Sequence, residues 1–460
     1  MPNAFAYLVF FSWPIFVLWS LIRYPVKKAI FISIALSTLL LPSAFEANLP
    51  LLPPLDKDNI AGLSIVLFLL LLRKKFKIFQ PGLSTKLFIG YFIVIGITVE
   101  LNTMPIIIGS KYLPGLTHHD TFSLIVRLII YTMPFYLGRY FSTSLRDTEL
   151  FFKIMVVMAL VYTLPMLFEL KMSPQLHYIA YGYQPSQFVQ EMRENGYRPM
   201  VFEGHGLGLA FWMSTCVMAA SALLKNKIRA TILSPGALVC YLFVILIFCK
   251  TWSATVYAML GMIFILKLRP ETQVKWSLIL AALVILYPVT KVNGILPEKE
   301  IISVISQYNP ERAQSLQFRF QNENEMLAHA LERPYFGWGN WGRNRIYSDW
   351  DGRDLSVVDG RWIGELGTNG WTGFILCYAI LLTPLYYARK TFKYIKEPKD
   401  QVFFAALALI LAVCVMDSIP NTGMGPIHLF LAGILLGQAE VLKQQQNLLH
   451  NEETKPNRYK

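Results

Sequence analysis

The sequence predicts an all-α fold, a polytopic membrane helical bundle of about 12–13 spans. Of its 460 residues, 54% are hydrophobic and only 15% are charged, whereas a soluble domain usually carries about 25% charged residues. The apolar residues also gather in runs of about 17–22, the length that a helix needs to cross the hydrocarbon core. Because such runs recur along the whole chain, we expect one membrane domain over residues 1–460.

The predicted spans follow one another from the first residues of the chain. They are residues 4–22, 29–45, 59–72, 87–106, 121–141, 150–170, 204–224, 231–249, 252–268, 277–291, 361–387, 401–418 and 427–442. The first segment has no basic stretch before it and no small-residue cleavage site after it. It therefore predicts a span and not a signal peptide.

The orientation of the spans follows from the basic residues. Short loops that are dense in Lys and Arg face the cytoplasm. These loops are residues 23–28, 73–77, 225–229, 267–275 and 389–399, and the tail 443–460 falls on the same side. The two long loops, 171–203 and 292–360, then lie outside, and the second is expected to contain amphipathic helices. This placement explains the formal net charge of +13, so no nucleic-acid partner is predicted.

The long outer loops carry their positive charge mainly as arginine. These arginines are Arg193, Arg198, Arg312, Arg319, Arg333, Arg343, Arg345, Arg353 and Arg361. Membrane topology requires only positive charge, but a guanidinium also grips phosphate in two-point contacts. The arginines therefore predict an anionic ligand on the outer face. The alternative is that each one pairs with an acid of the same loops, such as Glu311 or Asp349.

Asn309 and Pro310 predict the start of a helix, because Asn is a common cap and Pro fits the first turn. The helix is expected to end near Glu332, before Pro334. One face carries Leu316, Phe320, Leu327 and Leu331, and another carries Arg312, Arg319, Glu323 and Met326. An amphipathic helix of this kind lies on the membrane surface or caps a cavity.

A segment rich in glycine and aromatic residues, 335–342, follows this helix. Its glycines allow tight turns. Trp338 and Trp341 offer flat apolar faces on which sugar rings stack, so both are candidate glycan contacts. The alternative is that these aromatics lie at the membrane interface, where Trp and Tyr are enriched.

Arg127 lies inside the fifth predicted span, where a charge is costly and usually faces a cavity or a partner. The alternative is that its long side chain reaches the outer interface. His118 and His119 do not share a helix face and have no further spaced ligand, so no metal site is predicted, and Asp120 is expected to cap a helix. The sequence has no phosphate-binding Walker motif, no dinucleotide fingerprint and no CxxC pair among its 5 cysteines. No cofactor is therefore predicted.

Several of these residues occur in an order that is typical of one family. Arg319 precedes Met326-Leu-Ala-His-Ala-Leu-Glu-Arg-Pro-Tyr-Phe-Gly-Trp-Gly339, and Asp359-Gly-Arg-Trp-Ile-Gly-Glu-Leu-Gly-Thr-Asn-Gly-Trp-Thr-Gly373 follows. Upstream stands Arg198-Pro-Met-Val-Phe-Glu-Gly-His-Gly-Leu-Gly208. Over residues 195–385, this order resembles the O-antigen ligase and O-antigen polymerase superfamily. Two positions depart from it: no Arg follows Ser253, and Asp359 stands where the ligases carry His. The resemblance therefore leaves ligase and polymerase open.

The resemblance implies a membrane glycosyltransferase of bacterial surface polysaccharide and lipopolysaccharide assembly, with multiple spans in the inner membrane and loop 292–360 in the periplasm. The donor would be a glycan on undecaprenyl diphosphate. The acceptor would be a hydroxyl of a second glycan or lipid, and membrane lipids would be the remaining partners. The implied reaction requires no metal and no nucleotide.

The resemblance also implies roles for particular residues. Pre-placed cations stabilise the charge that grows on a leaving diphosphate, and the candidates are Arg198, Arg319 and Arg127, the last at membrane depth. Asp359 is the candidate base, with His205 in reserve. Arg361 is expected to hold Asp359 or to contact the glycan. The alternative for Asp359 is a helix N-cap before the following span.

Two other classes of function compete with a transferase. A transporter or flippase of lipid-linked glycan also has about twelve spans and charged cavities, but it often shows internal repeats, which this sequence lacks, and it has little use for a long outer loop rich in Arg and Trp. The second competing hypothesis is a non-catalytic scaffold of an envelope-polysaccharide assembly.

Overall fold

The helices of the structure follow the predicted spans. The computed structural model describes residues 1–48, 53–77, 79–193, 196–421 and 424–453. Its helices are α1 (Ala4–Arg23), α2 (Val26–Leu40), α3 (Ile60–Leu71), α4 (Leu83–Glu100), α5 (His118–Phe141), α6 (Leu145–Met172), α7 (Leu176–Tyr181), α8 (Gly206–Lys225), α9 (Pro235–Phe248), α10 (Trp252–Lys267), α11 (Pro270–Val292), α12 (Glu298–Tyr308), α13 (Pro310–Leu331), α14 (Arg361–Thr391), α15 (Pro398–Asp417) and α16 (Pro426–Glu453). Phe188–Glu191 and Phe392–Tyr394 form short 3-10 turns.

Nine helices in the described part of the chain are long and apolar enough to cross a membrane, namely α1, α4, α5, α6, α8, α11, α14, α15 and α16. The chain is therefore a multi-pass membrane bundle, as its composition predicted. The other predicted spans coincide with the shorter helices α2, α3, α9 and α10, so the total of 12–13 spans remains a prediction. The predicted span 87–106 was too long at its end, because α4 stops at Glu100.

Two short antiparallel hairpins were not predicted. β1 (Ile106–Ile108) pairs with β2 (Lys111–Leu113), and β3 (Met192–Arg193) pairs with β4 (Gly196–Tyr197). Strands of two or three residues are too short to show alternating polarity. In the sequence, the three isoleucines of β1 therefore looked like the end of the preceding span.

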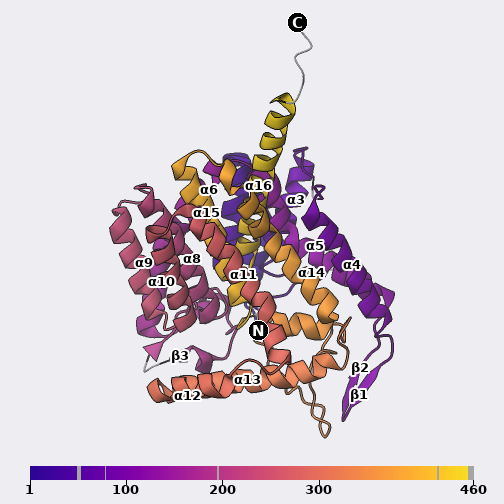
Figure 1. The fold of residues 1–460 in the computed structure, drawn as a ribbon. Coiled ribbons are helices and arrows are strands. Elements are labelled where there is room, and N and C mark those ends of the chain that lie inside the picture. The colour runs from indigo at the N-terminus through magenta and orange to yellow at the C-terminus, as the bar shows by residue number, and fades with distance from the viewer. Residues whose placement is uncertain (49–52, 78, 194–195, 422–423, 454–460) are drawn as a thin grey trace.

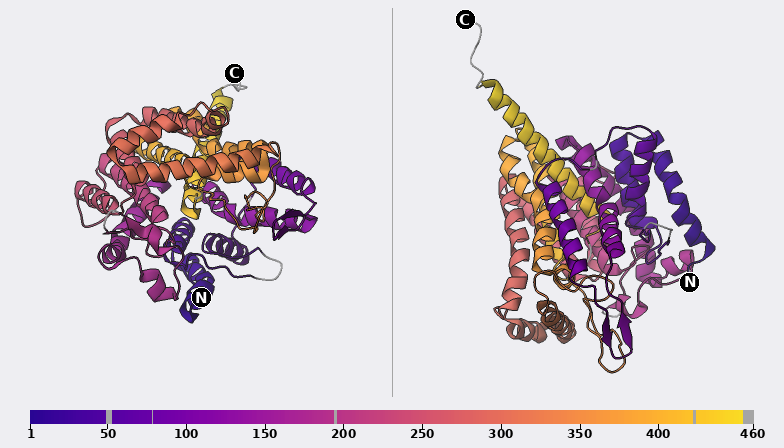
Figure 2. Two further views of the ribbon diagram at one scale, coloured as in Figure 1. Left: turned by 90° about the horizontal axis from the view of Figure 1, so that it is seen from below. Right: turned by 90° about the vertical axis from the view of Figure 1, so that its right-hand side faces the viewer.

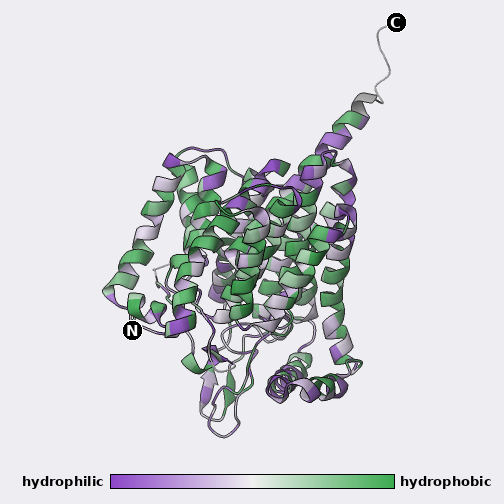
Figure 3. Ribbon diagram, turned by 90° about the vertical axis from the view of Figure 1, so that its left-hand side faces the viewer, coloured by the Kyte–Doolittle hydropathy of each residue, from purple (hydrophilic) through white to green (hydrophobic). Residues whose placement is uncertain are grey.

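The two ends of the bundle differ (Figures 1 and 2). Helices α12 and α13 lie across one end, and the β1–β2 hairpin and β3 lie at that same end, whereas α16 projects from the opposite end. We call the first the loop end and the second the basic end. Loops 171–203 and 292–360 thus lie together, as the alternation of spans predicted. Figure 3 shows mostly hydrophobic helices between the two ends, with hydrophilic residues concentrated at the ends and on the helices that lie across the loop end.

Helices α8, α15 and α16 form the centre, since 83% of the apolar window of each is buried, against 33% for α1 and α11. Helix α16 packs on α5 without intervening side chains. A Cβ added at Gly433 would lie 2.0 Å from the Phe135 carbonyl oxygen, and one added at Gly138 would lie 2.3 Å from the Phe430 carbonyl oxygen. Small residues allow backbones to approach in this way inside membranes.

An ion pair fixes the same two helices near the basic end. Arg139 is 2% exposed, and its Nε and Nη2 donate to the two carboxylate oxygens of Glu440, both at 2.8 Å. The remaining guanidinium hydrogens reach the carbonyl oxygens of Gln80 and Pro81 at 3.2 and 3.1 Å. A buried charge is tolerated when all its donors are satisfied, so this arginine serves the packing of α5, α16 and the segment before α4.

Helix α14 is broken at Gly370, whose φ of 64° lies in the left-handed region. The segment after α13 fills the break. Trp371 N–H donates to the Pro334 carbonyl at 2.7 Å, and Trp338 N–H donates to the Gly367 carbonyl at 2.9 Å. A Cβ at Gly370 would lie 2.3 Å from the Tyr335 carbonyl carbon. The predicted turns of the 335–342 segment therefore serve to hold the first half of α14 in place.

Helix α13 begins as predicted, because the Asn309 side chain accepts a hydrogen bond from Arg312 N–H at 3.1 Å. The predicted division of its faces was partly wrong. Glu323 and Met326 are buried, since Glu323 accepts from the Tyr287 hydroxyl at 2.8 Å and pairs with Lys291 at 3.1 Å. This contact ties α13 to the end of α11.

Glu169 anchors loop 171–203 to α6. Its carboxylate is fully buried and accepts hydrogen bonds from the backbone N–H groups of Leu176, Met200 and Val201 at 2.8–2.9 Å. Three such bonds satisfy a buried carboxylate. Both ends of the loop are therefore held on one side chain, which places residues 198–205 beside the bundle.

His177 is the second anchor of this loop. It is fully buried; its Nε2 accepts from Ser43 N–H at 3.1 Å, and its Nδ1 donates to the Tyr183 carbonyl at 2.9 Å. Burial lowers the pKa of this imidazole to about 4, whereas an unfolded His titrates near about 6.5. At a pH between these two pKa values, the imidazole is protonated in the unfolded chain but neutral in the folded protein. The contribution of His177 to stability is therefore present at neutral pH and lost as the pH falls from about 6.5 to about 4.

We expect the free energy of unfolding in detergent to fall by up to about 3 kcal/mol across this window through His177. The variant H177N keeps one donor and one acceptor but has no proton to gain, so its stability is expected to depend less on pH. Thermal unfolding of both proteins at pH 7.0, 5.5 and 4.5 measures the difference. Identical pH dependence in the two proteins would contradict this role.

Candidate functional site

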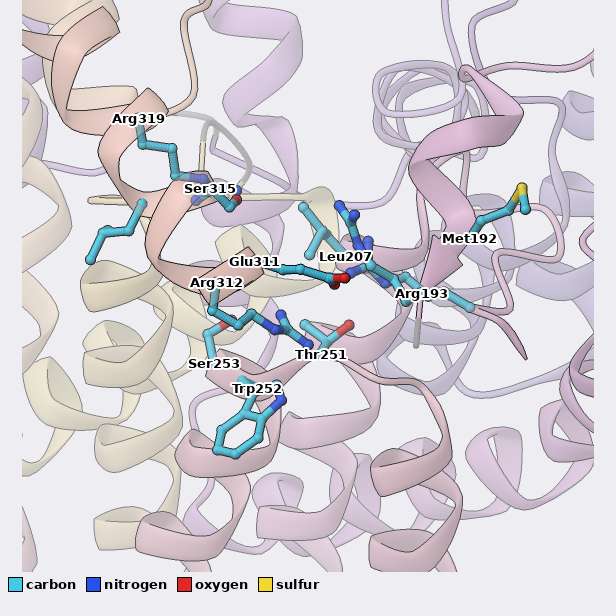
Figure 4. Close-up of a pocket in the computed structure, with 12 residues that line it drawn as sticks. Met192, Arg193, Leu207, Thr251, Trp252, Ser253, Glu311, Arg312, Ser315 and Arg319 are labelled. Atoms are coloured by element: carbon cyan, nitrogen blue, oxygen red, sulfur yellow. The ribbon is translucent and has the colours of Figure 1, made fainter. Parts of the chain in front are cut away.

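A cavity of about 300 Å³ lies at the loop end between α13, the start of α10 and the segment around β3. We call it the arginine cavity. It is lined by Met192, Arg193, Arg198, Leu207, Thr251, Trp252, Ser253, Glu311, Arg312, Ser315, Leu316 and Arg319. Figure 4 shows Glu311, Arg312, Ser315 and Arg319 extending from α13 toward Arg193 and Leu207, with Trp252 and Ser253 beside them. Two pairs of arginines from segments that are far apart in sequence thus share one cavity with a single lining carboxylate.

Arg198 is the most buried of the four, at 3% exposed. Its Nε and Nη1 have no hydrogen-bond partner in the described part of the chain, and Nη1 lies 3.9 Å from Oε2 of Glu191. Burial lowers the pKa of this guanidinium to about 10, so it remains protonated at neutral pH. An unsatisfied buried donor costs about 1–3 kcal/mol. Arg198 is therefore a buried cation that lines the cavity and is not fully satisfied by the described residues.

Gly206 makes room for Arg198. A Cβ at this position would lie 2.2 Å from Cδ of Arg198 and 2.6 Å from Oε2 of Glu191. Glu191 is fully buried and accepts a hydrogen bond from Gly206 N–H at 3.2 Å. Glu191 was not among the predicted site residues, because nothing in its sequence neighbourhood distinguishes it from a solvated loop acid.

Arg319 joins the arginine cavity to a second one. Its Nε lies 3.5 Å from Oδ2 of Asp359, and Asp359 lines a cavity of about 480 Å³, which we call the acid cavity. The acidic and basic residues that line it are Lys57, Asp58, Glu203, His205, Asp359, Asp417 and His428. Burial raises the pKa of the Asp359 carboxyl, and the positive charge of Arg319 opposes this shift. The two predicted residues of opposite charge are thus in contact, although 40 positions separate them in sequence.

One alternative for Asp359 is wrong, and its ion pair comes from a residue other than Arg361. The N-cap of α14 is Gly360, without a side-chain bond, so Asp359 does not cap that helix. The ion pair to Asp359 comes from Arg319, while Arg361 directs Nη2 to the Tyr131 hydroxyl at 3.4 Å. Asp120 was likewise misassigned: Thr117 is the N-cap of α5, and Asp120 completes its capping box.

His205 is the N-cap of α8. Its Nδ1 accepts from Leu207 N–H at 3.1 Å, and its Nε2 lies 3.0 Å from Oε1 of Gln190, to which it donates. Burial and the charges of Arg198, Arg193 and Arg319 lower the pKa of His205 to about 4. Both ring nitrogens are therefore engaged and the lone pair is weakly basic, which makes His205 a poorer candidate base than Asp359.

The remaining predicted residues lie elsewhere. Arg127 and Arg361 line a different cavity, described below. Trp338 stacks on His329 with ring centroids 4.5 Å apart, and Arg333 lies 4.1 Å from its centroid. Trp341 is half-exposed on the loop beyond it. The structure does not bring these tryptophans to the arginine cavity, and the aromatic ring that lines it belongs to Trp252, over which Arg312 lies at 5.9 Å.

Metal-ligating side chains do not gather in the residues that the structure describes: no group of three His, Cys, Asp or Glu residues is arranged to hold a metal ion there. No protein family, curated protein or solved structure matches this chain.

We expect inorganic pyrophosphate to bind the arginine cavity and to raise the temperature of thermal unfolding. The double variant R198A/R319A is expected to weaken this binding about tenfold or more, since each lost charge-assisted hydrogen bond contributes about 1.5–3 kcal/mol. Calorimetric titration measures the dissociation constant. The matched control is R353A, which removes an exposed arginine of the same loop. Equal binding by the double variant and the control would rule out the cavity as an anion site.

Proposed function

We propose that the protein is a membrane glycosyltransferase of bacterial surface polysaccharide assembly, which transfers or polymerises a glycan from undecaprenyl diphosphate at the loop end. The loop end would face the periplasm, because the short basic loops lie at the other end. One observation carries the proposal: the buried guanidinium of Arg198, with two nitrogens lacking hydrogen-bond partners among the described residues, lines the same cavity as Arg319, which contacts Asp359.

The arginines fit the leaving group of such a reaction. The bond between the anomeric carbon and the diphosphate oxygen breaks, and its electron pair leaves with the diphosphate. Arg198 and Arg319 would stabilise the growing charge, and removal of one such donor typically costs about 2.7–4 kcal/mol of barrier. Their planar forks suit two phosphate oxygens at once, which a lysine cannot match.

Asp359 fits the base. The acceptor hydroxyl oxygen forms the new bond to the anomeric carbon, and its proton passes to the Asp359 carboxylate. The contact of 3.5 Å with Arg319 keeps the base beside the position of the leaving group. Burial raises the pKa of Asp359, which strengthens it as a proton acceptor.

A transporter of lipid-linked glycan is the second candidate, and the acid cavity favours it. This cavity extends to His428 at the start of α16, a buried residue whose ring nitrogens have no hydrogen-bond partner among the described residues. Buried ionisable groups that line a cavity between spans are typical of ion and proton pathways. A transporter would use Arg198 and Arg319 only to bind its substrate.

The test is transfer by the purified protein in proteoliposomes that contain an undecaprenyl-diphosphate-linked glycan, without added metal or nucleotide. Chain growth indicates a polymerase, and transfer to a lipid A core acceptor indicates a ligase. R198A/R319A is expected to lose at least about a hundredfold in rate, while R353A retains it. Movement of the lipid across the bilayer without either product would replace this proposal with the transporter.

The pH dependence of the rate tests the role of Asp359. The base acts as a carboxylate, so the rate is expected to fall as the pH drops through its raised pKa. D359N is expected to lose about 10²–10⁴ in rate and to lack this acid limb. The control D351N alters an exposed acid of the same loop. An unchanged acid limb in D359N would assign the base to another residue.

A further inference from the structure

Arg127 lies on α5, about 14 Å along the axis from His118, and its side chain is exposed. It forms no hydrogen bond and no ion pair within 4 Å in the described part of the chain, although its charge acts on the Asp56 carboxyl. A charge at this depth is costly unless a cavity, water or an opposite charge accompanies it. Arg139, on the same helix, serves packing and donates two hydrogen bonds to the Glu440 carboxylate. Arg127 has no such partner among the described residues.

Arg127 opens into a cavity of about 370 Å³ between α4, α5 and the first half of α14. Its charged lining residues are Arg127, Arg361 and Glu365. The Glu365 carboxylate accepts hydrogen bonds from the Tyr91 hydroxyl at 2.5 Å and from Asn369 Nδ2 at 2.9 Å. The cavity is thus lined by two guanidinium groups and one carboxylate, and that carboxylate already accepts two hydrogen bonds. The net charge of these lining residues is therefore positive.

An apolar groove continues from this cavity. The two share the lining residues Tyr91, Leu128, Tyr131, Arg361 and Glu365, and the groove extends along Phe88, Thr132, Phe135, Cys377, Ile380, Leu381, Leu429 and Ala432. On α5, the order Arg127, Leu128, Tyr131, Phe135 runs from the loop end toward the basic end. A positive head site is therefore followed, deeper in the bundle, by a site for hydrocarbon.

We propose that α4, α5 and α14 bind a long-chain lipid with a phosphate or diphosphate head. The head lies at Arg127, the first carbons of the chain enter the groove, whose volume is about 80 Å³, and the rest of the chain extends into the membrane. This site is separate from the arginine cavity and does not require that the protein be a transferase. If the proposed function holds, the consequence is that the acceptor is lipid-linked as well as the donor. Asp359, which contacts Arg319 of the arginine cavity, precedes Arg361 of this cavity by two residues in the chain.

Binding to the purified full chain tests this site independently of activity. Dissociation constants for undecaprenyl diphosphate, phosphatidylglycerol and inorganic pyrophosphate are measured by native mass spectrometry from detergent. We expect R127Q to weaken binding of the long-chain phosphates about tenfold or more and R127K to weaken it less. L128W is expected to weaken long-chain binding without affecting pyrophosphate, because it fills the junction of cavity and groove. R146Q, at the exposed start of α6, is the matched surface control.

The outcomes separate cleanly. One lipid phosphate that remains bound to R198A/R319A but is lost from R127Q supports a second site. A preference for undecaprenyl diphosphate over phosphatidylglycerol identifies a carrier lipid, and equal affinity identifies bulk phospholipid at the same site. Equal binding by R127Q and R146Q overturns the proposal and leaves Arg127 as a side chain that reaches the membrane surface. If the unmodified protein binds the lipid at Arg127 but transfers no glycan, the proposed function alone is refuted.

Discussion

A buried helix that breaks has to satisfy its freed backbone hydrogen-bonding groups elsewhere in the protein, and the break in α14 shows how this chain does so. At Gly370 the helix loses its regular bonds, and the segment 334–339 supplies carbonyl oxygens and N–H groups in their place. This exchange fixes the direction of the first half of α14. The positions of Asp359 and Arg361 at its start, and thus the relation of the two arginine-bearing cavities, depend on it.

The bundle could be predicted largely from sequence because its driving force is local. Runs of apolar residues report the lipid solvent directly, and the alternation of basic loops reports the end at which each helix begins. The start of α13 was equally local, since Asn309 bonds the N–H three residues on. The buried face of α13 could not be predicted locally, because the burial of Glu323 depends on Lys291 and Tyr287 from another helix. The hairpins escaped prediction because two or three residues show no period.

The candidate site could be predicted only in part. Residue type indicated nine outer arginines, and the family resemblance selected Arg198, Arg319 and Asp359 as site candidates. The structure brings these three to adjoining cavities. Single residues gave no signal for Glu191, Gly206 or Trp252, since their importance arises from contacts between distant segments. The same limit explains Arg127 and Arg361: the sequence indicated that both were unusual, but not that they share a cavity. An arginine at membrane depth can serve packing or binding. Arg139 serves packing, and we propose binding for Arg127 on the same helix.

The glycine contacts between α5 and α16 have a consequence for biogenesis. Helix α16 follows the other described helices in sequence, yet it occupies the centre of the bundle and touches the α5 backbone directly. The ribosome therefore delivers the central element after its surroundings have entered the membrane. Until then, the surfaces of α5 and α14 that α16 covers lack this partner. The space that α16 occupies therefore has to stay accessible until α16 is made. A side chain larger than glycine at position 433 would collide with the α5 backbone and prevent α16 from docking, even if every earlier helix had inserted correctly.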